Sequence, residues 1–484
     1  MRKNYMKKSK VEKIKYFFQP SSIAVIGASK TKGKVGNAVI TNLVKGSIKK
    51  SSLKTGKSGL GGFKGKIFPV NIKAKENEKI LGKAAYKSIS DIPEKIDTAV
   101  IAIPAKYVLN TIHECGKKGI KGLVIITAGF SESGDKEIED KLVETAKQYG
   151  MRIIGPNCLG IMRTHNNLNA SFSDFSPPKG PIAFISQSGA LCTAVINYSY
   201  QESIGFSNFV SIGNKSDISD ADLLYYFLED EQTKVISIYI ESIPTGEEFI
   251  NAVKKVVPKK PIVVYKAGRT SAGAAAASSH TGSIAGSDKI YDALFKQLGV
   301  YRASTMNELF DCSKALGYQP PARGDRVAIV TNAGGPGVMA ADEVFLSGLE
   351  LAEVSGDLLD DLNSILPSAW SHRNPIDILG DAMGDRFKES LDLVAADYNN
   401  DALIVILCPT AMCEPLKTAK VVVDLSKNIN KPITCAWLGL ESRLSEKYLD
   451  DNGIPELSFP QRCVRAIKAL VERGNFLKKK NISF

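Results

Sequence analysis

Short, unbroken apolar runs recur along this chain and alternate with amphipathic stretches. Apolar runs with no polar alternation are typical of parallel strands that are buried on both faces, and the stretches between them have helical spacing. The runs lie at 22–26, 66–71, 98–104, 122–129, 182–186, 206–212, 235–241, 261–266, 327–331, 402–407 and 432–438. The pattern predicts an α/β protein built from doubly wound parallel sheets, with helices at about 108–118, 246–256 and 288–298.

The length of 484 residues suggests about three domains. We expect a basic tail at 1–19, a first domain at 20–160, a second at 161–318 and a third at 325–484. The Gly- and Pro-containing stretch 317–324 is the clearest predicted linker.

The net charge of +12 is concentrated in two stretches. Residues 1–20 hold seven Lys or Arg against one Glu, and residues 44–66 hold seven Lys and no acid. The rest of the chain is therefore close to neutral, and the charge belongs to the tail and to a Gly/Ser/Lys-rich insertion at about 45–62, both predicted to be mobile. This distribution argues against nucleic-acid binding. We assign no function to the insertion.

The eight cysteines include no C-x-x-C pair, which argues against a zinc site and against a disulfide framework. No metal site is predicted in this chain. No apolar run approaches the roughly 18 residues of a membrane helix, and the N-terminus lacks a signal-peptide core. We therefore expect a cytoplasmic protein that does not enter a membrane.

A glycine turn and a helix start follow the first apolar run, a geometry that cradles phosphate with backbone N–H groups. These positions are Gly27, Ala28, Ser29, Val35 and Gly36. The spacing is not G-x-G-x-x-G, and the next run ends at Asn71 and Lys73 without the acid that binds an NAD ribose. This disfavours an NAD(P)-linked oxidoreductase, whereas Lys73 would suit the 3′-phosphate of coenzyme A. A turn that binds nothing remains an alternative.

Polar residues gather at the predicted carboxyl ends of strands in the second domain. Ser186, Ser188 and Gly189 open a helix and suit phosphate, although a plain Ser N-cap would look the same. Gly213 follows the next run, and Glu241 ends the run after it. Since parallel strands end at one edge of a sheet, we expect these residues to converge.

A stretch of small residues at 266–288 contains a single imidazole, His280, and is predicted to be a loop. It leaves the same sheet edge as Glu241, whose carboxylate could hold the second imidazole nitrogen. A flexible linker with an incidental histidine is the alternative. In the third domain Gly334, Gly335 and Gly337 open another helix that faces an anion.

Six motifs in order then support a resemblance that covers about 20–475. They are Ile26-Gly-Ala-Ser with Val35-Gly36, Phe68-Pro-Val-Asn71, Gly155-Pro-Asn-Cys-Leu-Gly160, Ser186-Gln-Ser-Gly189, Ser279-His-Thr-Gly282 and Asn332-Ala-Gly-Gly-Pro-Gly337. With them the chain resembles the α part of ADP-forming acyl-CoA synthetases, relatives of succinyl-CoA synthetase.

The resemblance implies a Rossmann-like CoA-binding domain followed by two flavodoxin-like ligase domains. It implies that His280 is phosphorylated and that Glu241 orients and stabilises the phosphohistidine. The implied CoA-binding residues are Gly27, Ala28, Ser29, Val35, Gly36, Asn71, Lys73, Pro104 and Thr127. The implied phosphate-binding residues are Asn157, Ser186, Ser188, Gly189, Gly213, Gly334, Gly335 and Gly337.

The implied reaction is acyl-CoA + ADP + phosphate ⇌ acid + ATP + CoA, through an acyl phosphate and a phosphohistidine. No ATP-grasp half is visible, so we expect a β partner that carries ADP or ATP with Mg²⁺, in an α2β2 assembly. Acetate is the commonest acid of the family, but the sequence leaves the acid open. The rival interpretation is a non-catalytic CoA-binding regulator or scaffold, which would need the glycine turn but neither His280 nor Glu241.

Overall fold

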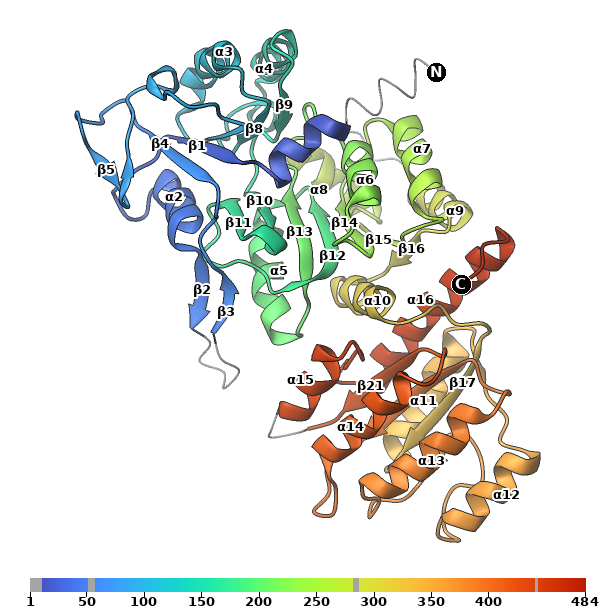
Figure 1. The fold of residues 1–484 in the computed structure, drawn as a ribbon. Helices are drawn as coiled ribbons and strands as arrows, with labels where there is room; N and C mark the ends of the chain where they lie inside the picture. Colours follow the sequence, from blue (N-terminus) through green and yellow to red (C-terminus); the bar gives the residue numbers. More distant parts are fainter. Residues whose placement is uncertain (1–10, 51–56, 282–286, 440–442) are drawn as a thin grey trace. The chain divides into compact units, whose positions relative to one another are not determined.

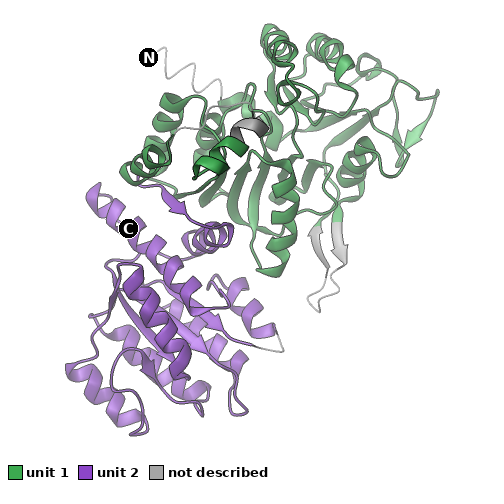
Figure 2. Ribbon diagram, turned by 180° about the vertical axis from the view of Figure 1, so that it is seen from behind, with its two compact units in different colours: residues 1–298 green, residues 299–484 purple. Residues whose placement is uncertain are grey.

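The computed structural model describes residues 11–50, 57–281, 287–439 and 443–484. The chain forms two compact units, Met1–Leu298 and Gly299–Phe484 (Figure 2). Unit 1 contains two parallel-sheet domains and unit 2 contains a third, so the predicted α/β class is confirmed.

The first domain of unit 1 has a parallel sheet in the order β4-β1-β7-β8-β9. Every residue of β1 is buried, as the apolar run predicts for a strand covered on both faces. The elements are β1 (Ser22–Ile26), α2 (Val35–Lys45), β2 (Ser47–Lys50), β3 (Lys57–Leu60), β4 (Lys66–Val70), β5 (Lys79–Ile80), β6 (Lys83–Ala84), η1 (Ile89–Asp91), β7 (Thr98–Ile101), η2 (Ala105–Tyr107), α3 (Val108–Lys118), β8 (Gly122–Ile125), η3 (Ser131–Ser133), α4 (Lys136–Gln148) and β9 (Arg152–Ile154).

Helix α3 spans the residues that the pattern predicts. Val108, Ile112 and Cys115 are buried on one face, and the helix ends at Gly119, which is left-handed. Helix α3 packs beside α4, and both cover the sheet (Figure 1).

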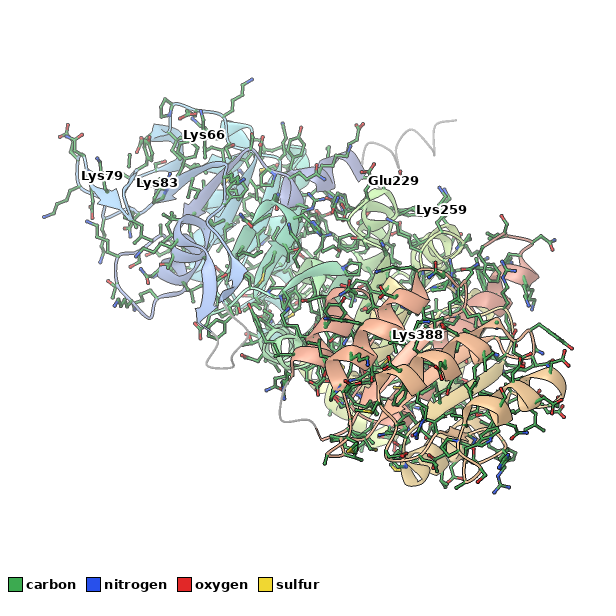
Figure 3. All side chains as sticks on the ribbon, turned by 60° about the horizontal axis from the view of Figure 1, so that its bottom comes forward. Lys66, Lys79, Lys83, Glu229, Lys259 and Lys388 are labelled. Carbon is green, nitrogen blue, oxygen red and sulfur yellow. The ribbon has the colours of Figure 1, made fainter. Side chains whose placement is uncertain are left out.

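Two stretches that we predicted to be mobile have regular structure. Residues 11–18 are helical, and Phe17 and Phe18 are fully buried, because the apolar face of this segment outweighs its lysines. Within the insertion, β2 and β3 form an antiparallel ladder. Lys66, Lys79 and Lys83 of this domain lie at the surface (Figure 3).

The second domain of unit 1 has a sheet in the order β11-β10-β13-β12-β14-β15. Strand β10 is antiparallel to both neighbours, and the strands from β13 to β15 are parallel. The elements are β10 (Gly160–Arg163), η4 (Thr164–Asn166), β11 (Leu168–Ser171), β12 (Lys179–Ser186), α5 (Gly189–Gln201), β13 (Phe206–Ser211), α6 (Asp220–Glu229), β14 (Val235–Ile240), α7 (Gly246–Val256), β15 (Ile262–Lys266), α8 (Ser271–Thr281) and α9 (Asp288–Leu298).

The predicted loop at 266–288 is wrong over much of its length, because Ser271–Thr281 form helix α8. Alanine has the highest helix propensity, and this segment contains a run of four alanines. Thr270 also supplies a cap, since its Oγ1 accepts a hydrogen bond from Gly273 N–H (3.1 Å). The alanines therefore favour a helix here over the flexible loop that the small residues suggest.

Unit 2 has a parallel sheet in the order β18-β17-β20-β21, and β19 also pairs with β17. The elements are β16 (Tyr301–Ala303), α10 (Met306–Tyr318), β17 (Arg326–Thr331), α11 (Gly334–Leu346), β18 (Glu350–Leu351), α12 (Gly356–Ile365), β19 (Ile376–Asp377), α13 (Gly384–Ala396), β20 (Ala402–Leu407), α14 (Pro415–Ser426), β21 (Ile433–Trp437), α15 (Leu444–Asp451) and α16 (Pro460–Lys479).

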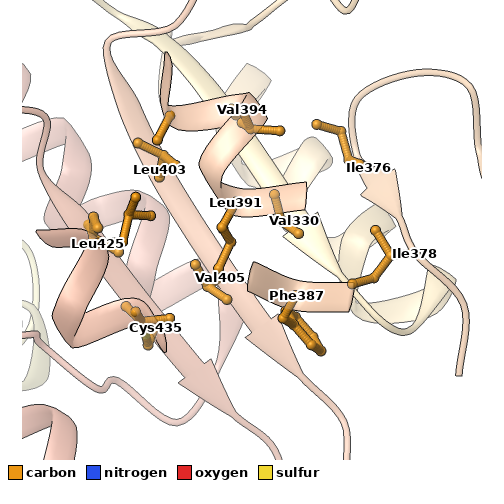
Figure 4. Close-up of a cluster of buried hydrophobic side chains, with 14 of the residues drawn as sticks. Val330, Ile376, Ile378, Phe387, Leu391, Val394, Leu403, Val405, Leu425 and Cys435 are labelled. Atoms are coloured by element: carbon orange, nitrogen blue, oxygen red, sulfur yellow. The ribbon is translucent and has the colours of Figure 1, made fainter. Parts of the chain in front are cut away.

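One face of this sheet packs on α13 and α14 through a buried apolar cluster that includes Val330, Phe387, Leu391 and Val405 (Figure 4). Helix α10 packs along α16. The predicted linker at 317–324 therefore lies inside unit 2, and the boundary between the compact units lies at Leu298/Gly299. No helix in the described part of the chain is long and apolar enough to cross a membrane.

Candidate functional site

The carboxyl ends of four strands meet at one edge of the second sheet. Ser186 on β12 lies beside Ser211 on β13 and beside Tyr239 on β14, and Ile240 on β14 lies beside Lys266 on β15. Gly213, Ser188 and Glu241 follow directly after these strand ends. These residues therefore follow neighbouring strand ends at one edge of the sheet, and their convergence with His280 into a phosphate site stays a prediction.

The turn from β12 into α5 is held by its own hydroxyls. Ser186 Oγ donates to Ser188 O (3.0 Å) and accepts from Ser188 N–H (3.1 Å). Ser188 is the N-cap of α5, and its Oγ accepts from Leu191 N–H (3.3 Å). The two hydroxyls thus shape the helix start, and the backbone N–H groups at Gly189 and the positive end of α5 are what this turn offers to an anion.

Gln187 joins this helix start to the strand end that carries Glu241. Its Oε1 accepts from the backbone N–H of Glu241 and from that of Ser242, the latter at 3.0 Å. Its Nε2 lies 3.5 Å from Ser242 Oγ. The sequence alone does not predict this contact, although Gln187 belongs to one of the six motifs. No local signal could reveal it, because its partners lie 54 and 55 residues away.

Glu241 is 7% exposed and lies among polar side chains. The Tyr239 hydroxyl hydrogen-bonds its carboxylate, and burial together with the Glu241 charge raises the pKa of Tyr239. Lys215 Nζ lies 3.2 Å from Ser242 O and 2.5 Å from Asp220 Oδ2. Burial lowers the pKa of Lys215, and the charges of Asp220 and Glu241 oppose this effect. A buried lysine therefore stands near the predicted orienting carboxylate.

The backbone of His280 lies in the last turn of α8. Its side chain is outside the described residues, as is Gly282, so the distance from the imidazole to Glu241 stays untested. Helix α8 begins shortly after β15, whose carboxyl end lies beside that of β14. The segment that carries His280 therefore leaves the sheet edge that carries Glu241.

Asn157 and Gly213 belong to two turns that bind each other within unit 1. Gly213 has φ +61°, and a Cβ there would overlap Pro156 O, so only glycine fits. Asn157 Nδ2 donates to Asn214 Oδ1 (3.2 Å), and Asn214 N–H donates to Pro156 O (3.0 Å). Both predicted phosphate-binding residues thus have structural contacts that explain their presence.

The first domain has a second cradle at the carboxyl ends of β1, β4 and β7. Gly27 has φ +95°, and a Cβ there would overlap Ala102 O. Helix α2 starts so close to this turn that a Cβ on Gly36 would overlap Gly27 O. Within the described chain, the N-cap residue Lys34 makes no side-chain cap hydrogen bond. The helix start is thus close to a glycine turn and open to an anion, as a CoA phosphate site requires.

The remaining predicted CoA residues surround this cradle. Asn71 Nδ2 donates to Ala28 O (2.6 Å), and Asn71 Oδ1 accepts from Lys73 N–H (2.8 Å), so Asn71 ties the turn to the segment with the exposed Lys73. Ser29 Oγ accepts from Thr31 N–H (3.0 Å), and Thr127 Oγ1 donates to Ile103 O (2.7 Å). The other two are placed by the backbone alone: Val35 at the first position of α2 and Pro104 at the N-cap of η2.

The start of α11 in unit 2 repeats the turn at the start of α5. Thr331 Oγ1 donates to Ala333 O (3.0 Å) and accepts from Ala333 N–H (3.1 Å), as Ser186 does with Ser188. Asn332 takes the place of Gln187 and forms two 2.8 Å hydrogen bonds with the backbone of Cys408, the residue directly after the neighbouring strand β20. The chain thus builds the same strand-to-helix turn twice.

The three glycines of α11 differ in what surrounds them. A Cβ on Gly337 would lie 3.2 Å from Pro375 and from Thr331, and one on Gly334 would lie 3.2 Å from Asp377 Oδ2. In the described chain, a Cβ on Gly335 would meet no atom within 4 Å. Packing therefore explains Gly337, whereas Gly335 leaves open space at the helix start.

The described residues contain no group of three or more His, Cys, Asp or Glu side chains placed to hold a metal ion.

Comparison with known proteins finds matches along the whole described fold. Residues 21–164 match the CoA binding domain, residues 179–316 the succinyl-CoA ligase like flavodoxin domain, and residues 327–471 the ligase-CoA domain. The chain is 44% identical over 466 residues to the α subunit of ADP-forming acetate–CoA ligase II of Pyrococcus furiosus, covering 95% of this chain and 97% of that protein.

Two further similar proteins are a curated relative that acts on another acid and a solved structure. An ADP-forming 4-hydroxybutyrate–CoA ligase of Nitrosopumilus maritimus is 38% identical over 95% of this chain and 64% of its own length. A chain of the dinucleotide-forming acetyl-coenzyme A synthetase 1 of Candidatus Korarchaeum cryptofilum, solved with phosphate and ADP, superposes with a TM-score of 0.87 at 39% identity, covering 97% of this chain and 99% of that one.

Proposed function

This chain belongs to the family of NDP-forming acyl-CoA synthetases and resembles the α subunits of ADP-forming acetate–CoA ligases. We propose that it catalyses the reaction of such a ligase with the phosphate-binding helix starts, Glu241 and His280. The enzyme interconverts acetyl-CoA, ADP and phosphate with acetate, ATP and CoA. The observation that carries the proposal is the single sheet edge at which the start of α5, Glu241 and the segment with His280 follow neighbouring strand ends.

In the first step CoA lies on the Gly27 turn, and phosphate bound at the start of α5 attacks the thioester carbonyl. Attack by hydrogen phosphate forms the carbon–oxygen bond of the acyl phosphate and breaks the carbon–sulfur bond, and the CoA thiolate leaves and takes up the proton that the phosphate gives up. The backbone N–H groups at Gly189 and the positive end of α5 favour the phosphate charge throughout. The α11 start with Gly335 is proposed to bind phosphate in the same way.

In the second step a nitrogen of His280 attacks the acyl phosphate at phosphorus, and acetate leaves. Splitting the transfer in this way is covalent catalysis by a histidine nucleophile. Glu241 accepts a hydrogen bond from the other imidazole nitrogen and favours the cationic ring that forms as phosphorus is attacked. The phosphoryl group then passes to ADP.

We propose that ADP or ATP and Mg²⁺ bind on an ATP-grasp β partner in an α2β2 assembly. The name of the Pyrococcus furiosus relative, an α subunit, supports a β partner. We propose acetate as the first substrate to test, because the two Pyrococcus furiosus relatives are acetate–CoA ligases. A similar protein of Nitrosopumilus maritimus is named for 4-hydroxybutyrate, so the acid varies among relatives. A cytoplasmic location stays a prediction.

The test uses the isolated full chain and radiolabelled phosphate. We expect His280 to become labelled from acetyl-CoA plus labelled phosphate, because both predicted phosphate-binding helix starts belong to this chain. We expect no label from γ-labelled ATP until the β partner is added. Labelling from ATP by the pure chain would reveal a nucleotide site within it, and no labelling from acetyl-CoA would mean that the partner completes the first site. A non-catalytic CoA-binding scaffold would show no label with the partner present.

A further inference from the structure

A buried lysine, Lys215, lies in the turn between β13 and α6, and the proposed reaction gives it no role. Its side chain is 2% exposed and pairs with Asp220, whose side chain is 4% exposed (Nζ–Oδ2 2.5 Å). Its Nζ also donates to the carbonyl oxygen of Ser242 (3.2 Å). Burying an ammonium group is costly unless it is paired and hydrogen-bonded, so these two contacts are what keep the lysine inside the domain.

The backbone of Lys215 is also unusual. Its φ is +57°, in the left-handed region that side chains other than those of Asn and Asp rarely adopt. The turn around it is fixed, because Ser216 Oγ donates to Gly155 O (2.9 Å) and Asp217 Oδ2 accepts from Ile153 N–H (2.8 Å). A lysine held in a strained conformation on a fixed turn indicates that its side chain has a function.

The side chain of Lys215 holds the backbone just beyond β14. The strand ends at Ile240, so Glu241 and Ser242 follow it directly. Gln187 Oε1 accepts from the N–H groups of both residues, and Lys215 Nζ donates to the carbonyl of Ser242. Ser242 is therefore held at its N–H by the start of α5 and at its C=O by the turn before α6.

The charge of Lys215 acts in the same direction as its hydrogen bond. Burial lowers the pKa of Lys215, and the charges of Asp220 and Glu241 both favour its charged form. Coulombic attraction is mutual, so the ammonium group also restrains the Glu241 carboxylate. Two independent contacts thus join Lys215 to the strand end that carries Glu241.

We propose that Lys215 is a positioning residue for Glu241. By holding the Ser242 carbonyl and attracting the Glu241 carboxylate, it fixes the orientation in which that carboxylate accepts a hydrogen bond from the imidazole of His280. Asp220 supplies the counter-charge that allows the lysine to be buried. The effect on His280 rests on the proposed function, whereas the hold on Ser242 does not.

The test removes both charges of the ion pair together. Lys215→Met alone would leave Asp220 buried without its counter-charge and would destabilise the fold for that reason. In the double variant Lys215→Met/Asp220→Asn no buried charge of the pair is left behind, and methionine keeps an unbranched stem. We expect a urea midpoint near that of the wild type and unchanged CoA affinity. Labelling of His280 from acetyl-CoA and phosphate, measured on the full chain with its β partner, should slow by about tenfold or more.

Unit 2 offers a matched control. Lys314 pairs with Asp450 (2.6 Å), and the two side chains are 3% and 7% exposed. Lys314 Nζ also donates to a backbone carbonyl, that of Glu456 (2.9 Å). Lys314→Met/Asp450→Asn therefore removes the same groups from residues that the proposed reaction does not use, and it should keep the wild-type labelling rate.

Hydrogen exchange gives a readout that needs no activity. In the Lys215 double variant the amides of Glu241 and Ser242 should exchange about threefold faster or more, because one side of the backbone hold is lost. The control variant should leave them unchanged. Mass spectrometry of peptides that cover residues 239–245 measures this. A conservative variant, Lys215→Arg, keeps a charge and several donors and should label His280 faster than the double variant does.

Wild-type labelling in the Lys215 double variant would overturn the proposal, as would equal slowing in the two double variants, which would show a purely structural pair. Unchanged exchange at Glu241 and Ser242 would also overturn it. If the double variant does not fold, labelling by folded Lys215→Arg decides, and loss of labelling there overturns the proposal. No label on the wild type with its partner present would instead refute the proposed function, and the exchange rates would still decide whether Lys215 holds Ser242.

Discussion

Substitution of Gln187 tests how the start of helix α5 is held to the carboxyl end of strand β14. Gln187→Ala removes the acceptor of two backbone N–H groups, those of Glu241 and Ser242. A net contribution of about 0.5–1.5 kcal/mol for each hydrogen bond gives an expected loss of about 1–3 kcal/mol in the free energy of unfolding. Because Glu241 loses its backbone anchor, we expect His280 labelling from acetyl-CoA to slow by about ten- to a hundredfold.

The assay combines urea unfolding, rapid-quench labelling of His280 and CoA calorimetry. CoA affinity should not change, because Gln187 lies outside the Gly27 cradle. Gln319→Ala is the matched control: this glutamine also makes two backbone hydrogen bonds, to Ile433 N–H (2.8 Å) and to Gly453 O (2.6 Å). It should lose similar stability and keep normal labelling. Equal slowing in both variants, or none in Gln187→Ala, would refute the role of Gln187 in positioning Glu241.

Three further experiments test the proposed roles of His280, Glu241 and Lys73. His280→Ala should abolish turnover and leave the fold and CoA affinity intact, since alanine suits helix α8; normal turnover by this variant, measured in a coupled assay, would contradict the mechanism. Glu241→Gln should slow labelling of His280 more than it weakens CoA binding, because the amide still accepts a hydrogen bond but lacks the charge that favours the cationic ring; equal losses would make Glu241 structural. CoA should bind more tightly than dephospho-CoA in calorimetry, and Lys73→Ala should remove the difference; equal affinities in the wild type would exclude Lys73 from the 3′-phosphate site.

The strands and several helices could be predicted from the sequence because their signal is local. A strand buried on both faces needs an unbroken apolar run, as in β1 and β20, and each of these runs lies where the pattern placed it. The amphipathic pattern located α3 and α9 to the residue. We could predict that Ser188, Gly213 and Glu241 lie at one edge of the sheet, because parallel strands all end at the same edge.

The wrong predictions were based on the amino-acid composition of a segment instead of on its helix propensity or on the pattern of its two faces. Small residues suggested a loop at 266–288, but four consecutive alanines and the Thr270 cap form a helix. Lysines suggested mobile segments at 1–19 and 45–62, but Phe17 and Phe18 bury one face of the first, and β2 and β3 pair within the second. Charge on one face of a segment does not prevent the other face from packing.

The sequence by itself determined the class of fold, the positions of the strands along the chain and the placement of Glu241 at a strand's carboxyl end, because these depend on local pattern and on the rules of parallel sheets. Only the tertiary structure decided that Gln187 holds Glu241, that Lys215 lies between Asp220 and Ser242, and that Arg152 pairs with Asp217 and Asp222. These contacts join residues far apart in the chain. Their hydrogen bonds depend on which strand ends become neighbours and how each side chain is buried, and no local pattern records either.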